Sequence, residues 1–478
     1  MLRAISVLFC CIYYTNALQI RVSCNSAPER ATAFALEYGT PLAAFAQYAA
    51  PMLQEVGTNS FIPQRALANA STTSVVRPNV DTLYTTLVYD LSHADLAITL
   101  PPIDPGRFYV FPFYDPYGDN YANLGSVNNS LPGQYLLRVA SSAGAQPGFQ
   151  TESGPGNYTG YVSSPSTYGS IVVRILVRNE SDIAAVNDIQ DHISATPIAR
   201  SSTASAPPLS FANLTAGLSN DTVESVLQLT ARLAPWNLPE VASNQQHVAC
   251  NLQAAGVADG TYTQPQGVDL GIAAADAQAS QKARLSQPGT NIDLGNGWTV
   301  LAPSLSGNFG VDYEVRAFVA ETGYLQLDPY EAIYPTIDVN GSTGALTLGP
   351  REAYVFTFSA RPPVTGFWSL TAYGSDEFLV PNPMNVYSLS DRSNLTYGNG
   401  ESVYGDSSTA VADGPFQVLL QPADVSPPAN WTRNWLPIEA GGGNFSVNLR
   451  WYGPTDSLSN GSYAYPSITK VTALSAGP

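Results

Sequence analysis

The spacing of apolar positions changes along the chain and predicts different elements in turn. Between residues 31 and 53 apolar side chains recur at helical spacing, with an interruption at Gly39-Thr40-Pro41, which predicts two short helices and a kink. From 81 to 114 the period falls to two, so Leu83 and Leu87 share one strand face. A strand is expected near 171–177 and a helix after it.

The middle of the chain returns to helical spacing after a Ser- and Pro-rich linker at 199–209. Asp221 and Glu224 form a capping-box signal for one helix, and the Ala-rich stretch 269–285 predicts a second. Residues 313–320 fit a helix better than a strand. After Arg351 the period is two again, so that Phe356 and Trp451 lie on apolar faces whose opposite sides carry polar residues.

The order of periods predicts the fold class. Clean alternation is typical of sheets with one solvated face, so we expect an α+β, β-rich chain with two antiparallel β-sandwich or jelly-roll domains bridged by a helical region. The expected limits are 25–200 for the N-terminal domain, 201–330 for the linker and bridging helices, and 331–478 for the C-terminal β domain. A length of 478 residues suits two or three domains.

Composition narrows the class of function. Only 12% of the residues are charged, 44% are apolar, and the formal net charge is -17. Because phosphate contacts need a basic surface, nucleic-acid binding is excluded. We expect no transmembrane segment in the mature chain, and the sequence leaves the oligomeric state open.

The first residues predict a secreted protein. Arg3, the apolar stretch from Ala4 and the small residues before Leu18 match a signal peptide over residues 1–17, with a buried N-terminal strand as the alternative. Cleavage would remove Cys10 and Cys11, leaving Cys24 and Cys250. In an oxidising compartment these two predict one disulfide; two unpaired thiols or an intermolecular bridge are the alternatives.

Sequons for N-glycosylation are frequent and support a secretory route. They begin at Asn69, Asn128, Asn157, Asn179, Asn213, Asn220, Asn340, Asn394, Asn430, Asn444 and Asn460.

Of the standard catalytic and metal signatures, the sequence contains only a Ser-x-x-Lys match at Ser467 to Lys470, on a strand-like stretch, whereas that chemistry needs Ser and Lys one helical turn apart. Nucleophile-elbow, zincin, Walker and dinucleotide motifs are missing, and the three histidines are isolated from one another. We therefore expect neither a metal site nor a cofactor, although a calcium site at Asp115, Asp119 and Asn120 is a weaker alternative.

Two polar clusters interrupt strands that otherwise look apolar: residues 77–84 with 113–121, and residues 367–373 with 379–383. Because charged residues are scarce, Arg and Asp beside a core strand predict deliberate hydrogen bonding. One interpretation is that the clusters form a polar pocket with tyrosine walls. In the alternative they are structural: the first cluster is an Arg–Asp pair that fixes a loop, and the second is a strand face that lies in water. The expected catalytic residues are Asp81 and Asp115, as the most available acid/base groups. The expected ligand-binding residues are Arg77, Asn79, Tyr84, Tyr117, Trp368, Ser369, Tyr373 and Asn382.

The same clusters carry a family resemblance. Residues 31 to about 195 resemble the family called domain of unknown function 1254, through Glu37 to Leu42, Arg77 to Tyr84 and Asp191. Residues from about 296 resemble domain of unknown function 1214, through Asp312-Tyr313, Arg316-Ala317, Ala332 to Pro335, Pro362-Pro363, Phe367 to Thr371, Tyr373, Val380 to Pro383, Asn434 to Pro437 and Leu449 to Tyr452. The resemblance implies the two families in tandem and brings no activity with it. Together with the signal peptide and the sequons, it predicts a secreted eukaryotic member. Asn385-Val386-Tyr387 lacks the Arg expected before that tyrosine.

Two functions follow as hypotheses. The leading one is a secreted glycoprotein that binds or hydrolyses a small polar or carbohydrate-like ligand in a tyrosine-lined pocket near the domain junction. The alternative is a non-catalytic extracellular or cell-wall-associated structural glycoprotein, in which the polar clusters only hold loops in place.

Overall fold

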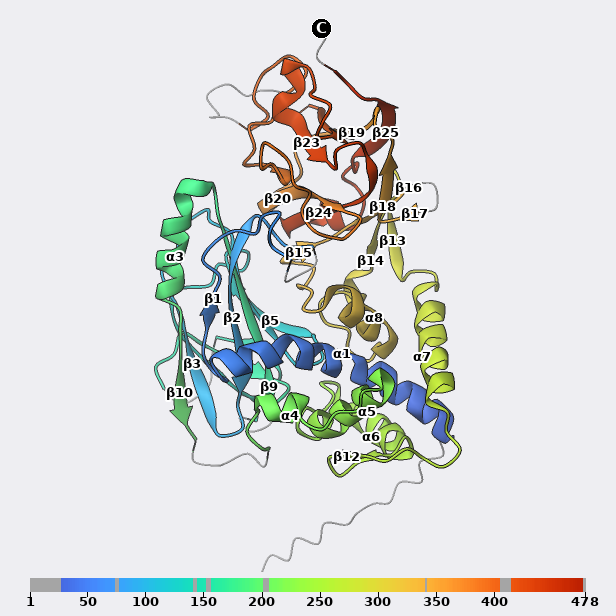
Figure 1. Ribbon diagram of the computed structural model, residues 1–478. Coiled ribbons are helices and arrows are strands. Elements are labelled where there is room, and N and C mark those ends of the chain that lie inside the picture. Colours follow the sequence, from blue (N-terminus) through green and yellow to red (C-terminus); the bar gives the residue numbers. More distant parts are fainter. Residues whose placement is uncertain are drawn as a thin grey trace, which may run out of the picture.

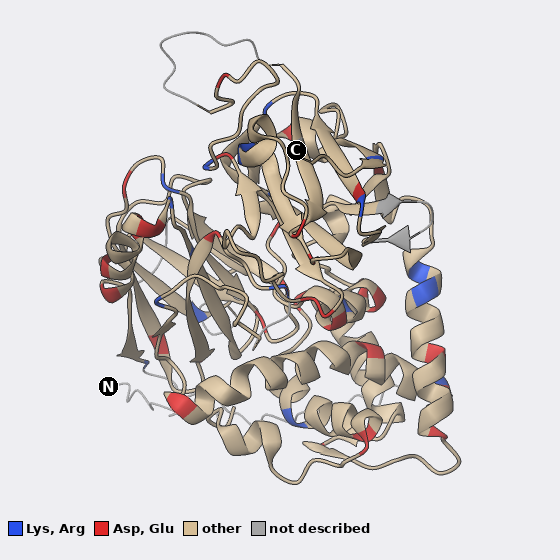
Figure 2. Cartoon of the chain, turned by 45° about the horizontal axis from the view of Figure 1, so that its top comes forward, with Lys and Arg blue, Asp and Glu red and all other residues tan. Residues whose placement is uncertain are grey.

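The computed structural model describes residues 27–73, 77–140, 144–151, 156–200, 206–339, 342–404 and 414–475. The fold is mixed α+β with more strand than helix and with several sheets. Figure 1 shows a β-rich part from the first half of the chain, a second from the last third, and a group of helices along one side of both. Acidic residues are spread over all three parts (Figure 2).

The strands β1–β10 form what we call the N-terminal β-body. It contains two five-stranded sheets, and a shared apolar core holds side chains of both, including Leu87, Ile98 and Phe111. The first sheet has the order β1 (Ile62–Pro63), β2 (Thr82–Asp90), β9 (Tyr168–Leu176), β4 (Tyr109–Tyr114), β5 (Asn120–Gly125). The second has the order β10 (Ser194–Ala199), β3 (Ala94–Leu100), β6 (Gly133–Val139), β8 (Gly160–Ser164), β7 (Gly148–Gln150). Helix α3 (Ile183–Asp191) precedes β10.

The strands β13–β25 form the C-terminal β-body, around a core that includes Trp298, Trp368 and Trp451. One sheet has the order β15 (Ala332–Ile333), β24 (Gly443–Pro454), β20 (Val364–Gly374), β21 (Ser388–Ser390), with β18 (Ala345–Leu348) also paired to β24. Another has the order β23 (Trp435–Ile438), β22 (Phe416–Pro422), β19 (Glu352–Phe358), β25 (Ser467–Thr472). A third runs β13 (Asn291–Gly295), β14 (Trp298–Leu301), β16 (Thr336–Val339), β17 (Ser342–Thr343). Helix α9 (Asp456–Ser459) follows β24.

A long first helix, α1 (Pro28–Glu55), organises the helical part. It contacts α4 (Phe211–Thr215), α5 (Thr222–Leu233), α6 (Gln245–Ala254), α7 (Leu270–Leu285) and α8 (Tyr313–Gly323). The short hairpin of β11 (Val257–Ala258) and β12 (Thr261–Tyr262) packs beside α5. The first helix therefore belongs with the helices of the middle of the chain, while the domain limits of the sequence analysis stay predictions.

The expectation of two short helices at 31–53 is wrong, because α1 is continuous and contains both Pro41 and Pro51. Its surroundings compensate for the lost backbone hydrogen bonds, since it packs against five other helices. Gly39 has a packing role: a Cβ at this position would overlap Thr230 of α5.

Other expectations for the middle of the chain agree with the structure. Residues 313–323 are helical, and the Asp221 side chain accepts hydrogen bonds from the backbone N–H groups of Val223 and Glu224. The sheets are not purely antiparallel, however. Strands β6 and β8 pair in parallel, as do β22 and β23, because longer connections join each pair.

The alternative of a solvated polar face for the 367–373 strand is also wrong. Ser369, Thr371 and Tyr373 are all fully buried. The opposite face of β20 does carry the apolar core, as expected. The polar face is covered because the loop before β2 packs on it, and an apolar cluster containing Phe108 and Phe367 joins the two β-bodies nearby.

Candidate functional site

The polar face of β20 and β24 lies where the two β-bodies meet. These strands pair antiparallel, with Ser369 opposite Arg450. Figure 1 shows β20 and β24 at the edge of the C-terminal β-body that faces the N-terminal one. We call the polar side chains at this contact the junction cluster: Asn79, Asp81, Ser369, Thr371, Tyr373, Asp391, Arg392, Arg450 and Tyr452.

Hydrogen bonds within the junction cluster connect the two bodies directly. The Tyr373 hydroxyl donates to the Pro78 carbonyl at 2.9 Å and accepts from Arg450 Nη2 at 2.7 Å. Arg450 Nη1 donates to Thr371 Oγ1 at 2.8 Å. Asn79 Nδ2 donates to the Tyr452 hydroxyl at 2.9 Å. The buried guanidinium and tyrosines thus hold the 78–81 segment on the sheet.

Arg392 bridges two carboxylates in the same cluster. Its Nη2 lies 2.5 Å from Asp81 Oδ1, and its Nη1 lies 2.9 Å from Asp391 Oδ1. The guanidinium also lies over the Phe367 ring, 4.6 Å from the centroid. Burial raises the pKa of Asp391 to about 6, against the opposing effect of Arg392. The cluster therefore contains a carboxyl group that titrates near neutral pH.

Several buried polar atoms of this region lack a hydrogen-bond partner among the described residues. They are Asp81 Oδ2, Thr82 Oγ1, Ser369 Oγ and Arg174 Nε. An unsatisfied buried polar atom costs about 1–3 kcal/mol, so each calls for a partner. Asp81 Oδ2 offers an acceptor and Ser369 Oγ offers a donor, and the two come from different β-bodies.

A second buried network surrounds Arg316 of α8. Arg316 Nη1 lies 3.1 Å from Asp119 Oδ2, and the guanidinium carbon lies 4.4 Å from the ring centroid of Tyr117, 4.8 Å from that of Tyr313 and 5.1 Å from that of Tyr38. The Tyr38 hydroxyl donates to that of Tyr117 at 2.8 Å. This network joins α1, α8 and the turn between β4 and β5.

Asp115 belongs to the Arg316 network and holds the same turn. Its Oδ1 accepts from the backbone N–H groups of Tyr117 at 2.9 Å and Asp119 at 3.0 Å. Burial raises the pKa values of Asp115 and Asp119, and their mutual repulsion adds to the effect on Asp115, while Arg316 opposes it.

The residues expected to form one pocket are thus divided between different places. Asn79, Asp81, Ser369 and Tyr373 meet in the junction cluster, while Asp115 and Tyr117 hold the turn beside Arg316. Asp81 and Asp115, the two carboxylates assigned to catalysis, therefore belong to separate networks.

The side chains of the remaining expected ligand-binding residues lie outside these contacts, although the Arg77 carbonyl accepts from Arg450 Nη2 at 3.4 Å. Arg77 is partly exposed and ion-pairs with Glu377 at the edge of the junction cluster, while the Tyr84 ring lies beside the Arg174 guanidinium. Trp368 is in the C-terminal core, where its indole N–H donates to Tyr404. Asn382 hydrogen-bonds only within its own loop.

Five junction residues were not among the expected site residues: Thr371, Asp391, Arg392, Arg450 and Tyr452. Arg450 had a usable signal, because it is a charged residue on a strand whose neighbours alternate with core side chains. Asp391 and Arg392 follow β21 in an ordinary polar turn, so the local sequence contains no sign of their contacts.

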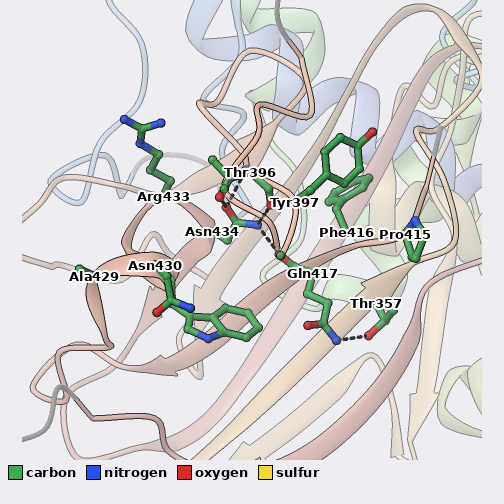
Figure 3. A pocket seen from close by; sticks show the side chains of 13 residues that line it. Thr357, Thr396, Tyr397, Pro415, Phe416, Gln417, Ala429, Asn430, Arg433 and Asn434 are labelled. Carbon is green, nitrogen blue, oxygen red and sulfur yellow. Dashed lines mark hydrogen bonds between the residues drawn. The ribbon is translucent and has the colours of Figure 1, made fainter. Parts of the chain in front are cut away.

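An open pocket lies elsewhere, in the C-terminal β-body. It has a volume of about 540 Å³ and lies between β19, β22, the 396–400 loop and the 3₁₀ helix η5 (Ala429–Asn434). Figure 3 shows side chains of these segments gathered around Asn434. None of the ligand-binding residues expected from the sequence lines it.

Most sequons are accessible. Asn213 is half-buried, Asn340 lies outside the described residues, and the remaining sequon asparagines are exposed. In four sequons the Ser hydroxyl donates to the Asn side-chain oxygen, for example Ser71 to Asn69 at 2.6 Å. Their glycosylation stays a prediction.

The expected signal peptide at 1–17 and Cys24 lie outside the described residues. Cys250 is disulfide-bonded, and its pairing with Cys24 stays a prediction.

Comparison with family models decides the relationship. Residues 58–197 match "Protein of unknown function (DUF1254)", and residues 331–456 match "Protein of unknown function (DUF1214)". The chain is a DUF1254–DUF1214 tandem. The resemblance expected from the sequence is therefore confirmed for both regions and their order. The junction cluster combines Asn79 and Asp81 of the DUF1254 region with Ser369, Arg392 and Arg450 of the DUF1214 region.

Two solved structures are similar to this chain at low identity, and the first of them shares its fold. The VPA0106 protein from Vibrio parahaemolyticus is 18% identical with a TM-score of 0.64, over 93% of this chain and all of its own. A putative uncharacterised protein from Burkholderia cenocepacia is 12% identical with a TM-score of 0.42, over 91% of this chain and 88% of its own. No curated protein matches.

Two searches of the described residues were negative. No helix there is long and apolar enough to cross a membrane. The described part of the chain also has no group of three or more His, Cys, Asp or Glu side chains placed to hold a metal ion.

Proposed function

We propose that this chain is a secreted glycoprotein that binds a small polar or carbohydrate-like ligand in the junction cluster. The observation that carries the proposal is the pair of unpartnered buried atoms, Asp81 Oδ2 and Ser369 Oγ. A ligand with a hydroxyl or amino group toward Asp81 and an acceptor toward Ser369 would satisfy both.

The charges of the cluster favour a polar ligand. Arg450 and Arg392 supply guanidinium groups, and Asp81 and Asp391, which Arg392 bridges, supply carboxyl groups. In a buried setting such charge-assisted hydrogen bonds are stronger than in water, so few contacts are needed for recognition. Tyr373 and Tyr452 are fully buried and contribute the tyrosine walls.

The same geometry supplies a candidate acid for hydrolysis. With a pKa of about 6, Asp391 holds its proton in mildly acidic medium and can donate it to a leaving group. Asp81, on the other side of Arg392, would orient the ligand or accept a proton from water. We keep Asp81 as the expected catalytic residue, and Asp391 replaces Asp115 as its proposed partner because the latter belongs to the Arg316 network.

A non-catalytic structural role is the second candidate, and the ion pairs favour it. Asp81 and Asp119 each already bond an arginine from a distant part of the chain, as groups that only fix loops would do. Under this alternative, water satisfies the unpartnered atoms.

A thermal-shift panel separates the two candidates. Sugars, sugar acids, hydroxy acids and amino acids are tested at about pH 5.5 and about pH 7.5, on either side of the Asp391 pKa. A junction ligand at about a hundred times its Kd stabilises the fold by about 2.7 kcal/mol, and Asp81→Asn removes the shift. Asp188→Asn, on the exposed face of α3, is the matched control. A panel without a hit, or a hit that Asp81→Asn leaves intact, supports the structural role.

The secreted part of the proposal has its own test. Expression in a eukaryotic host should give a protein that begins at Leu18 and loses mass on treatment with an N-glycosidase. An N-terminus at Met1, or an unchanged mass, would contradict it.

A further inference from the structure

The open pocket of the C-terminal β-body has a rigid floor. Asn434 Oδ1 accepts from the backbone N–H of Thr396 at 2.9 Å and from its hydroxyl at 3.2 Å. Asn434 Nδ2 donates to the carbonyls of Thr396 at 2.9 Å and Gln417 at 2.6 Å. Because one buried amide fastens three segments together, the pocket is preformed rather than dependent on a ligand.

The walls combine aromatic rings with amides. Tyr397 and Trp431 are half-buried, so part of each ring is available to a ligand, and Gln417 and Asn430 are exposed. Gln417 Nε2 is oriented by a hydrogen bond of 3.1 Å to Thr357 Oγ1 (Figure 3). Aromatic faces stack on the C–H faces of sugars, and amides pair with their hydroxyls.

The pocket is nearly neutral, although the chain is strongly acidic. The described residues that line it include no Asp, Glu or Lys, and the Arg433 side chain extends away from the amides in Figure 3. A charged ligand would find no counter-charge at the pocket floor. Among the described lining residues there is also no pair of carboxyl groups of the kind that glycoside hydrolysis uses.

We propose that this pocket binds a neutral saccharide of one to three units without hydrolysing it. Its volume of about 540 Å³ lies in the range typical of small-ligand sites. The site shares no residue with the junction cluster, so this inference does not depend on the proposed function.

Asn430 links the pocket to glycosylation, because Asn430-Trp431-Thr432 is a sequon. A glycan attached there would start at the pocket wall. Thr432 is exposed and does not line the pocket, so Thr432→Ala removes the sequon and leaves the Asn430 amide in place.

Saturation-transfer NMR on the whole chain tests the proposal, with cellobiose, maltotriose, chitobiose and mannobiose as probes and glucuronic acid as a charged comparison. We expect saturable binding of at least one neutral probe by the unglycosylated chain. Gln417→Ala should weaken it about tenfold, the equivalent of one good hydrogen bond. Tyr397→Ala should do the same through lost stacking. Gln253→Ala, on the exposed side of α6, should leave it unchanged.

Each outcome decides the question. Thr432→Ala protein made in glycosylating cells carries no glycan at Asn430. Binding by this variant, with none by the glycosylated parent, also supports the proposal, since the Asn430 glycan then fills the pocket of the parent. The proposal is overturned if neither the unglycosylated chain nor the Thr432→Ala protein gives a saturable signal with any neutral probe up to about 10 mM, because that limit corresponds to negligible affinity. Equal binding by Gln417→Ala and Tyr397→Ala proteins that keep the parental Tm overturns it as well, as does preference for glucuronic acid.

Discussion

Asp81 and Arg392 are 311 positions apart in the sequence, and their side chains lie 2.5 Å from each other where the DUF1254 and DUF1214 regions meet. The Asp81 side chain is almost fully buried, and the Arg392 side chain is 16% exposed. An ion pair in such a place stabilises the contact of the two bodies only while both partners are present.

Arg392→Ala should lower the free energy of unfolding by about 3 kcal/mol, because it leaves the Asp81 carboxylate buried without its cation. Asp81→Asn combined with Arg392→Ala should recover part of that loss. Urea unfolding of the parent, both single variants and the double variant gives the coupling energy. Strictly additive effects would show that the pair does not act as a unit.

Arg316→Met should destabilise the chain by about 3–5 kcal/mol, since the Asp119 carboxylate then lies buried without its cation. Arg316→Lys should recover only part of this, because an ammonium group cannot lie flat among three tyrosine rings as the guanidinium does. Thermal unfolding followed by near-UV circular dichroism is the measurement, as it reports on the tyrosines. A stable Met variant with parental Tm would refute the role given to this network.

Stability should fall as the pH rises from about 5 to about 8. Burial, together with repulsion from Glu314, raises the pKa of Glu37 to about 7. Burial, together with repulsion from Asp328, raises the pKa of Glu331 to about 8. The folded chain then binds more protons than the unfolded chain between about pH 4.5 and these values. The stabilisation that each protonated glutamate gives is complete below its pKa in the unfolded chain. It is lost as the pH rises past its pKa in the folded chain.

The Tm measured against pH checks this, together with two variants. Glu37→Gln and Glu331→Gln should each flatten the profile, by on the order of 1.4 kcal/mol for each unit of pKa shift. Glu55→Gln, at the exposed end of α1, is the control. A Tm that rises between about pH 5 and about pH 8 would contradict the prediction.

Non-reducing peptide mapping should find Cys250 linked to Cys24. Cys250 is disulfide-bonded, and removal of residues 1–17 would leave Cys24 as its remaining partner in the mature chain. The bond would fasten the start of the mature chain to α6, and its loss would cost about 2–5 kcal/mol. A linked peptide that contains Cys10 or Cys11, or a covalent dimer that dissociates on reduction, would contradict the assignment.

Local patterning predicted much of this fold. The apolar faces around Phe356 and Trp451 follow from the hydrophobic period, and the helix near 270–285 follows from its Ala-rich composition, because those signals act over a few residues. The tandem of domains was also recognisable from its motifs. The buried polar face of β20 was not, because alternation shows that a face is polar and not what covers it. Similarly, α1 is continuous through Pro41 and Pro51 only because other helices surround it.

Local patterning also predicted part of the site, namely the polar residues next to apolar strand positions. Asn79, Asp81, Ser369 and Tyr373 were selected as polar residues on apolar strands, and the fold brings them together. Asp115 has the same local signal but belongs to the Arg316 network. The pairing of Asp81 with Arg392 depends on how two distant segments meet, and no local pattern contains that information.

A crystal structure of the chain with a ligand from the thermal-shift panel would show whether the junction cluster is a binding site. We expect ligand density with polar atoms within hydrogen-bond distance of Asp81 Oδ2 and Ser369 Oγ, and no such density in Asp81→Asn crystals soaked in the same way. Ordered water alone at both atoms, with the ligand bound elsewhere, would contradict it.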